Sequence, residues 1–282
     1  MLLHCCTKCQ SDVEEMLTIQ TAIGAISPTQ PVMPMSHVTR YVAFEQFVAA
    51  NQVPLNSACP RNGSKATYLF YGAPFYRLPH KAPHELSLDE VDELPMGLLI
   101  PSSQMAGVKA EIYPFDTGAW SKGLYEPHLT PSNSCLDDFV ISSKDAPMDA
   151  AKLVTLLFGS NQKYITGDFR APGGSAVNPV VEKVMTLHRA RMMADIRRRA
   201  IEIVALEQVP WTHEGLVLIG PQHQLARRRK VVPALDALLS KSNVTVLTYI
   251  DMSPFSPTSD SRLVLEYAAK WLTQQGFLQD AP

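Results

Sequence analysis

The sequence lacks the short motifs that identify the commonest nucleotide-binding and hydrolytic enzymes. It contains no Walker-type phosphate loop, no Gly-x-Ser-x-Gly nucleophile elbow and no His-Glu-x-x-His zinc motif. It also lacks the glycine fingerprint and the regular strand–helix alternation of a dinucleotide-binding parallel sheet. These absences exclude several enzyme classes and leave the function to be inferred from less specific residues.

Long apolar runs are missing as well. No run reaches the roughly 18 residues that a membrane-spanning helix requires, and the N-terminus has neither the charged start nor the apolar core of a signal peptide. Three of the five cysteines cluster at Cys5, Cys6 and Cys9, which is not the spacing of a disulfide framework. A closed zinc site usually takes two separated ligand pairs, and no second pair follows. We therefore expect a cytoplasmic protein with no membrane association and no metal site.

What the sequence does contain is enough apolar material for a folded core. Hydrophobic residues make up 46% of the 282 residues and charged residues 18%, which argues against wholesale disorder. The formal net charge of -2 provides no general attraction for nucleic acid. The basic run Arg227–Lys230 is most often a solvated helix face, although it could also contact an RNA or DNA acceptor.

The pattern along the chain predicts an N-terminal appendage over residues 1–34 and a single α+β domain over residues 35–282. Strands and helices are mixed without regular alternation, which favours one mixed sheet with peripheral helices. Strands are expected at 66–71, 97–101, 111–115, 199–206, 216–219 and 244–250, and helices at 12–23, around 44–48, and at 150–158, 180–191, 231–239 and 262–272.

Glu202 is the most informative charged residue. Alternation along the strand at 199–206 puts apolar side chains on both faces, so the strand should be covered on both sides. A carboxylate there must lie near an end, in a cleft or beside a cation. The plainer interpretation is that Glu202 pairs with Arg198 or Arg199 at the solvated start of the strand.

Two further segments could bind a ligand. His37 and Thr39 open a predicted helix, and they would share a face if that start were extended; otherwise Ser36 or Thr39 is an ordinary helix cap. The stretch from Tyr68 to Arg77 is the densest aromatic segment, suited to stacking on a planar ring, but core packing explains aromatic residues on a strand equally well.

Asp116 follows a predicted strand in the turn Asp116-Thr117-Gly118. It could act as an acid, as a base or as an anchor for a ligand. The more common role of such a residue is to accept hydrogen bonds from the backbone amides of its own turn.

Three of these segments, in their order, resemble ADP-ribosyltransferase-fold proteins, most closely DarT-like toxins and tRNA phosphotransferases. The resemblance lies in Ser36-His37-Val38-Thr39, in the segment Tyr68–Arg77 and in the strand that carries Glu202, and it spans about residues 36 to 220. No clear Ser-Thr-Ser block is present. The resemblance implies an α+β domain of ADP-ribosyltransferase-like type.

The resemblance also implies roles. Glu202 and His37 would be catalytic, with His37 and Thr39 orienting NAD and Arg40 or Arg77 holding its pyrophosphate. Tyr71 or Tyr76 would stack on nicotinamide. NAD would be the substrate, and a nucleic acid or protein would be the acceptor, with the glycine-rich loop at 173–174 near it; a toxin or defence effector is the implied setting.

Two other hypotheses remain beside this one. A hydrolase could act through Asp116 and a nearby histidine, which requires the two side chains to be within hydrogen-bonding distance. A non-catalytic module that binds nucleotide or protein would have its carboxylate tied up in an arginine pair.

Overall fold

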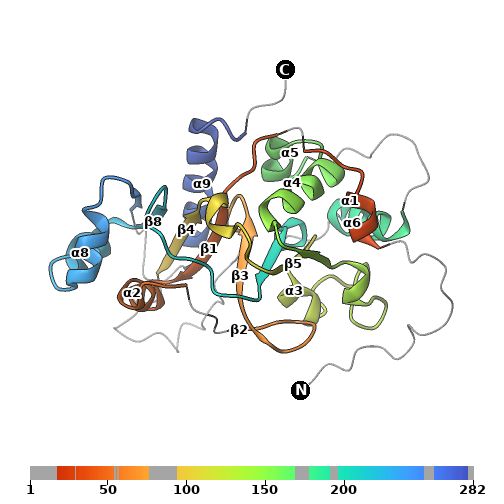
Figure 1. Cartoon of the computed structure of the whole chain (residues 1–282), viewed down its shortest axis with the longest axis horizontal. Helices are drawn as coiled ribbons and strands as arrows, with labels where there is room; N and C mark the ends of the chain where they lie inside the picture. Colours follow the sequence, from red (N-terminus) through yellow and green to blue (C-terminus); the bar gives the residue numbers. More distant parts are fainter. Residues whose placement is uncertain are drawn as a thin grey trace.

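The computed structural model describes residues 18–28, 30–53, 55, 57–75, 94–168, 178–190, 196–250 and 257–278. Figure 1 shows the arrangement of their helices and strands. The strands are β1 Met35–Arg40, β2 Ser57–Ala58, β3 Lys65–Tyr71, β4 Pro95–Ile100, β5 Ala110–Tyr113, β6 Ile141–Ser143, β7 Glu202–Ala205, β8 Val217–Pro221 and β9 Thr245–Tyr249.

These strands form one mixed sheet. Their order across it is β6-β5-β7-β3-β1-β4-β8-β9, and β2 pairs with β3 outside this path. All the pairs are antiparallel except β8 with β9, which run parallel. The predicted α+β class, a mixed sheet with peripheral helices, is confirmed.

The helices surround the sheet (Figure 1). Several begin at capping residues that the sequence supplies: the Asp145 side chain accepts from the Met148 amide, and the Asn178 side chain accepts from two amides of the next turn. The helices are α1 Ile19–Ile23, α2 Tyr41–Ala50, η3 Ser102–Met105, α3 Thr117–Ser121, η4 Leu136–Asp138, α4 Ala146–Leu157, α5 Asn161–Thr166, α6 Pro179–Arg189, η5 Ile196–Arg199, α7 Gln222–Arg228, α8 Pro233–Leu239 and α9 Pro257–Gln274.

Strand β7 lies in the middle of one half of the sheet and is buried on both faces, as its apolar alternation predicted. It pairs with β3 on one side and with β5 on the other. The predicted strand began at residue 199, but the segment up to Arg199 forms the short helix η5. Glu202 is thus the first residue of the strand.

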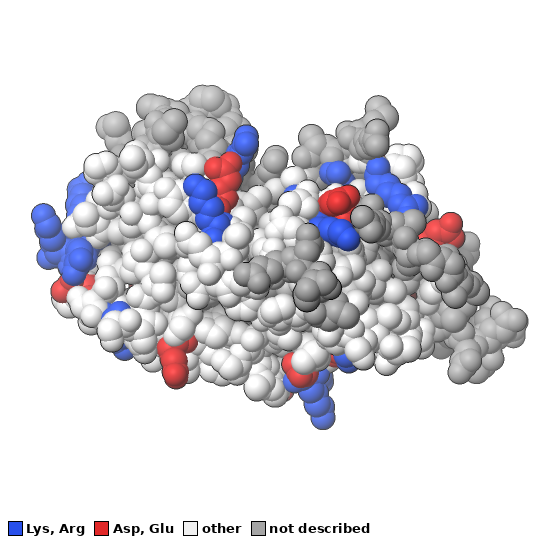
Figure 2. Space-filling model, turned by 90° about the horizontal axis from the view of Figure 1, so that it is seen from above, with Lys and Arg blue, Asp and Glu red and all other residues white. Residues whose placement is uncertain are grey.

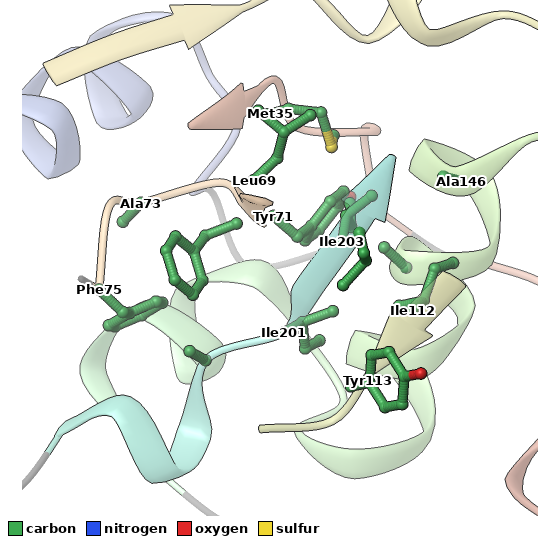
Figure 3. Packing of buried hydrophobic residues seen from close by; sticks show 14 of the residues in the cluster. Met35, Leu69, Tyr71, Ala73, Phe75, Ile112, Tyr113, Ala146, Ile201 and Ile203 are labelled. Atoms are coloured by element: carbon green, nitrogen blue, oxygen red, sulfur yellow. The ribbon is translucent and has the colours of Figure 1, made fainter. Parts of the chain in front are cut away.

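The main core packs against this half of the sheet. Met35, Leu69, Ile112 and Ile203 come from four different strands and lie close together beside Ala146 of α4 (Figure 3). Each is completely buried. Because the four strands meet only through long-range pairing, this core fixes their relative positions.

A smaller cluster lies under α9 on the other half of the sheet. Val38, Leu99 and Ile219 pack against Val264 of this helix. At Gly97 an added Cβ would collide with Val264, so the helix approaches the strand as closely as only a glycine permits.

The first strand was not predicted. We expected His37 to open a helix, with Ser36 or Thr39 as a possible cap, but the chain from Met35 to Arg40 is extended. The helix follows at Tyr41, and Arg40 stands at its N-cap position without a side-chain cap bond. The segment pairs with β4 along its whole length, and this long-range pairing outweighs its polar composition.

The predicted boundary at residue 34 does not separate an appendage from the core. Ile19 and Ile23 of α1 and the following Met33 are buried in the main core. The Gln20 side chain also accepts from the Ser142 amide of β6. The part of the predicted appendage from Thr18 onward therefore belongs to the domain, and residues 1–17 lie outside the described ranges.

Candidate active site

One face of the sheet carries polar side chains in its interior. The register places Glu202 of β7 opposite Phe70 on one side and opposite Tyr113 on the other. Two residues further along, Tyr68 and Glu111 occupy the corresponding positions on β3 and β5. Alternation puts all five side chains on the same face. Two buried glutamates therefore lie on adjacent strands of a single sheet face.

Glu202 is held by one neighbour, Thr117, at the start of α3. The Thr117 hydroxyl donates to Glu202 Oε1 at 2.5 Å, and the Thr117 amide donates to the same oxygen at 3.3 Å. In the described part of the chain no residue donates a hydrogen bond to Oε2. The carboxylate is thus oriented through one oxygen, and the other accepts no hydrogen bond from the described residues.

The Glu202 carboxyl is only 2% exposed, which disfavours its charged form. Burial first, and then the nearby Asp116 carboxylate, raise the pKa of Glu202 well above its ordinary value, whereas the hydrogen bonds from Thr117 lower it. The Asp116 side chain accepts from the Ala119 amide and caps α3, as the turn interpretation predicted. Glu202 therefore lies beside a second buried acid, which disfavours the ionisation of Glu202.

Tyr68 connects this acid to the surface. Its hydroxyl donates to the Ala58 carbonyl at 2.6 Å and lies beside the Thr117 hydroxyl. Burial and the Glu202 carboxylate raise the pKa of Tyr68, so the phenol stays protonated. Because its ring is only partly buried, Tyr68 is the aromatic side chain that both neighbours Glu202 and reaches solvent.

The second glutamate on this face, Glu111, has no free carboxylate oxygen. Arg61 Nη1 donates to Oε1 at 2.9 Å, and the Tyr113 hydroxyl donates to Oε2 at 2.7 Å. The Cys59 thiol lies 3.5 Å from Oε2, and burial raises its pKa, so it is not an activated nucleophile. Glu111 and its partners link the β2–β3 hairpin to β5.

The plainer interpretation of Glu202 as half of an arginine pair is wrong. In the described residues Glu202 forms no ion pair. Arg198 Nε donates instead to the His188 carbonyl, and the Arg199 guanidinium lies over the Phe75 ring. The hypothesis of a non-catalytic binding module predicted that this carboxylate pairs with an arginine, and the described residues show no such pair.

His37 lies where β1 and β3 stop pairing. These strands pair only at Met35–Tyr71 and Ser36–Phe70, and the His37 Nδ1 then lies 2.8 Å from the Tyr68 carbonyl. Its ring packs beside Phe47, and burial lowers the pKa of His37, so the imidazole is neutral at pH 7. His37 thus contacts the backbone carbonyl of Tyr68, whereas Glu202 lies near the Tyr68 phenol.

Strand alternation does not make these two side chains face each other. Ser36 is opposite Phe70, and Phe70 is opposite Glu202, so Glu202 lies on the Ser36 face and His37 on the other. A ligand that touched both would have to lie at the edge where β1 leaves β3.

Tyr71 is not placed to stack on a ligand. It is completely buried, its hydroxyl accepts from the Met33 amide, and its ring packs near Tyr164. Among the described aromatic side chains near Glu202, Tyr68 is the one that is partly exposed, and neither alternation nor the resemblance singled it out.

The other candidates divide into two groups. Thr39 is buried opposite Met96 of β4, and Arg40 is partly exposed at the end of β1. Tyr76, Arg77 and the glycine-rich loop at 173–174 lie outside the described residues.

Thr117 was missed at the sequence level. It follows Asp116 in a turn, and nothing local distinguishes it from an ordinary first-turn threonine. Its importance comes from the pairing of β5 with β7, which brings the end of β5 to the start of β7. Thr117 could have been identified from the sequence only if the order of the strands in the sheet had been known.

The predicted nucleic-acid contact at 227–230 has a simpler explanation. Arg228 pairs with Glu45 and Arg229 with Asp236, as expected for a solvated helix face. Over the described part of the face in Figure 2, charged side chains are scattered between broad uncharged areas. None of the described helices combines the length and the hydropathy needed to cross a membrane. Nor do the described residues group three or more His, Cys, Asp or Glu side chains in a way that could hold a metal ion.

No family model matches the chain, and no curated protein matches it. Among solved structures, the fold is similar to that of Thermus sp. 2.9 DarT in complex with NAD+. The TM-score is 0.39 at 10% sequence identity, over 78% of this chain and 98% of that chain. The similarity is weak and partial.

Proposed function

We propose that this chain is a cytoplasmic ADP-ribosyltransferase-like enzyme that uses NAD as its substrate. The observation that carries the proposal is the Glu202 carboxylate, which is buried, held through one oxygen by Thr117, and without a basic partner in the described chain. Such a group costs folding free energy, and buried acids with strongly shifted pKa values concentrate at functional sites.

The chemistry fits a single carboxylate. When the bond between the nicotinamide nitrogen and C1 of the ribose breaks, the electron pair leaves with neutral nicotinamide and positive character develops on the sugar. A fixed carboxylate stabilises that charge. The acceptor oxygen or nitrogen then bonds to C1 and loses its proton. In this scheme Glu202 Oε2 faces the ribose while Thr117 fixes Oε1.

The remaining residues have supporting roles in the proposal. His37 and Thr39 lie on the sheet face opposite to Glu202, so in the proposal they orient NAD from the edge where β1 leaves β3. Arg40 or Arg77 holds the pyrophosphate, and Tyr68 or Tyr76 stacks on nicotinamide. The acceptor is a nucleic acid or a protein.

The direct test is to incubate the purified protein with NAD and to measure released nicotinamide by mass spectrometry. The incubation is repeated with RNA, with single-stranded DNA and with a protein extract as acceptors. We expect nicotinamide release that is stimulated by one acceptor pool, which then carries ADP-ribose. No release above a protein-free blank with any of the pools would refute the proposal.

Replacing Thr117 by valine should slow this reaction while the similar shape of valine preserves the fold. The change removes the hydroxyl donor to Glu202 Oε1. Because a hydrogen bond to a charged group contributes about 1.5–3 kcal/mol, kcat should fall roughly 10- to 100-fold, with little change in KM. The measurement is nicotinamide release under saturating NAD.

Thr117→Ser is the matched control, since it keeps the hydroxyl and removes only a methyl group. It should retain most of the wild-type kcat. Equal losses in both variants would show that Thr117 acts through packing and not by orienting the carboxylate.

A further inference from the structure

Arg199 differs from the other arginines whose side-chain contacts are described. Arg61, Arg228, Arg229 and Arg262 each form an ion pair with at least one carboxylate, and Arg198 donates a hydrogen bond to the His188 carbonyl. Arg199 forms no ion pair and donates no hydrogen bond to any described residue, and its Nε is buried without a partner. A guanidinium has five N–H donors, so leaving them unpaired in a partly buried position is costly.

The surroundings of Arg199 keep its guanidinium in a fixed place. The carbon at the centre of the guanidinium lies 5.4 Å from the centroid of the Phe75 ring. At Gly167, which ends α5 with a φ of 75°, an added Cβ would overlap Nη1 of Arg199. The space for this side chain therefore depends on a glycine, which shows that the guanidinium lies in a recess and not on an open surface.

The described neighbours of Arg199 include no carboxylate. Burial first, and then the neighbouring Arg198, lower the pKa of Arg199, and the Tyr164 phenol is the described group that raises it. Arg197 precedes these two residues, so three consecutive basic residues lead into β7. An anion bound here would receive donors that are otherwise unpaired.

We infer that Arg199 anchors a binding site for a phosphate group. The planar fork of a guanidinium matches two phosphate oxygens, and the positive charge of the neighbouring Arg198 favours a phosphate over a singly charged carboxylate. Arg199 lies beside Phe75 and Gly167. Glu202 is instead held by Thr117, so the two side chains have different surroundings and the site is separate from Glu202. The inference does not depend on NAD cleavage.

Arginine footprinting of the intact protein tests this site. Phenylglyoxal modification is followed at each arginine by peptide mass spectrometry, in inorganic phosphate, in pyrophosphate, in ADP-ribose and in sodium chloride of matched ionic strength. At a ligand concentration about ten times Kd, modification of Arg199 should slow about tenfold, since only unbound protein reacts. Arg262, whose side chain is 80% exposed, is the internal control and should react at the same rate in all four solutions.

The three ligands also identify the source of the phosphate. Protection by ADP-ribose at a lower concentration than by pyrophosphate would assign the site to a nucleoside diphosphate, whereas equal protection would assign it to free phosphate. In the Glu202→Gln variant, the ligands should protect Arg199 from modification as well as they do in the wild type, because the two sites are separate.

Arg199→Lys and Arg199→Met complete the test. The rise in Tm that pyrophosphate causes should shrink in the lysine variant, which keeps the charge without the fork, and disappear in the methionine variant. If these variants do not fold, the footprinting of the wild type decides alone. Modification of Arg199 that no ligand slows, or that slows no more than that of Arg262, overturns the inference.

Discussion

Glu202→Gln is expected to reduce NAD cleavage by about 100- to 1000-fold, the usual effect of removing one group that stabilises charge in a transition state. Glutamine keeps the shape and can still accept from Thr117, but it cannot acquire the negative charge that Glu202 carries above its raised pKa and that opposes the positive charge on the ribose. The loss should appear in kcat, with KM for NAD within a few-fold of the wild-type value. Nicotinamide release under saturating NAD is the measurement.

The same variant should not destabilise the fold. In the wild type, burial and Asp116 raise the pKa of Glu202 above its ordinary value of 4.5. Between that value and the raised pKa, the folded glutamate keeps a proton that the unfolded one has lost, so folding takes up a proton and stability falls as the pH rises. Glutamine has no proton to lose. Urea denaturation at several pH values should therefore show the variant gaining stability over the wild type as the pH increases.

Glu111→Gln is the matched control. Glu111 is a buried glutamate on the adjacent strand and on the same face, but both of its oxygens are hydrogen-bonded. Its replacement weakens the bonds to Arg61 and Tyr113 and should cost about 1–3 kcal/mol of stability, while turnover is retained. Turnover lost equally in both variants would mean that the polar face contributes only to folding.

The strands of the main core could be predicted because they are rich in β-branched and apolar residues. β7 and β4 carry such residues on both faces, and β9 consists of threonine, valine, leucine and tyrosine. β1 could not be predicted in this way, because Ser36, His37 and Thr39 interrupt its pattern. Their polar groups are satisfied only by distant partners: the Ser36 hydroxyl donates to the Phe70 carbonyl, and His37 reaches the carbonyl of Tyr68.

The candidate site was predictable only in part for a related reason. A carboxylate between apolar neighbours marks Glu202 from the sequence alone. Its partners depend on the order β5-β7-β3, which brings together three segments that are far apart in the sequence. Alternation shows that Tyr68 and Tyr71 point to opposite faces, but only the register shows which face holds Glu202. That is why Tyr71 was chosen and Tyr68 was not.

Tyr164→Phe should cause a large loss of stability from the removal of a single oxygen atom. The Tyr164 hydroxyl donates to the Tyr71 carbonyl and accepts from the Ile201 amide, each at 3.1 Å. The Tyr71 amide bonds directly to the Ile201 carbonyl at 3.0 Å. The hydroxyl therefore replaces one rung of the β3–β7 ladder at the position just before Glu202.

Removing this hydroxyl leaves two buried backbone groups without a partner. Since each such group costs about 1–3 kcal/mol, the free energy of unfolding should fall by about 2–4 kcal/mol. Packing against Phe75 and Phe158 is retained, so no large cavity contributes. Urea denaturation measures the loss, and hydrogen exchange of the Ile201 amide should accelerate more than that of amides in β8.

Tyr71→Phe provides the comparison, because its hydroxyl accepts a hydrogen bond from one backbone group, the Met33 amide. It should cost about 1–2 kcal/mol, roughly half the effect of Tyr164→Phe. If the two variants lose the same stability, or if exchange at Ile201 is unchanged in Tyr164→Phe, the hydroxyl does not act as a rung of the ladder. The start of β7, and with it the position of Glu202, would then be held by side-chain packing alone.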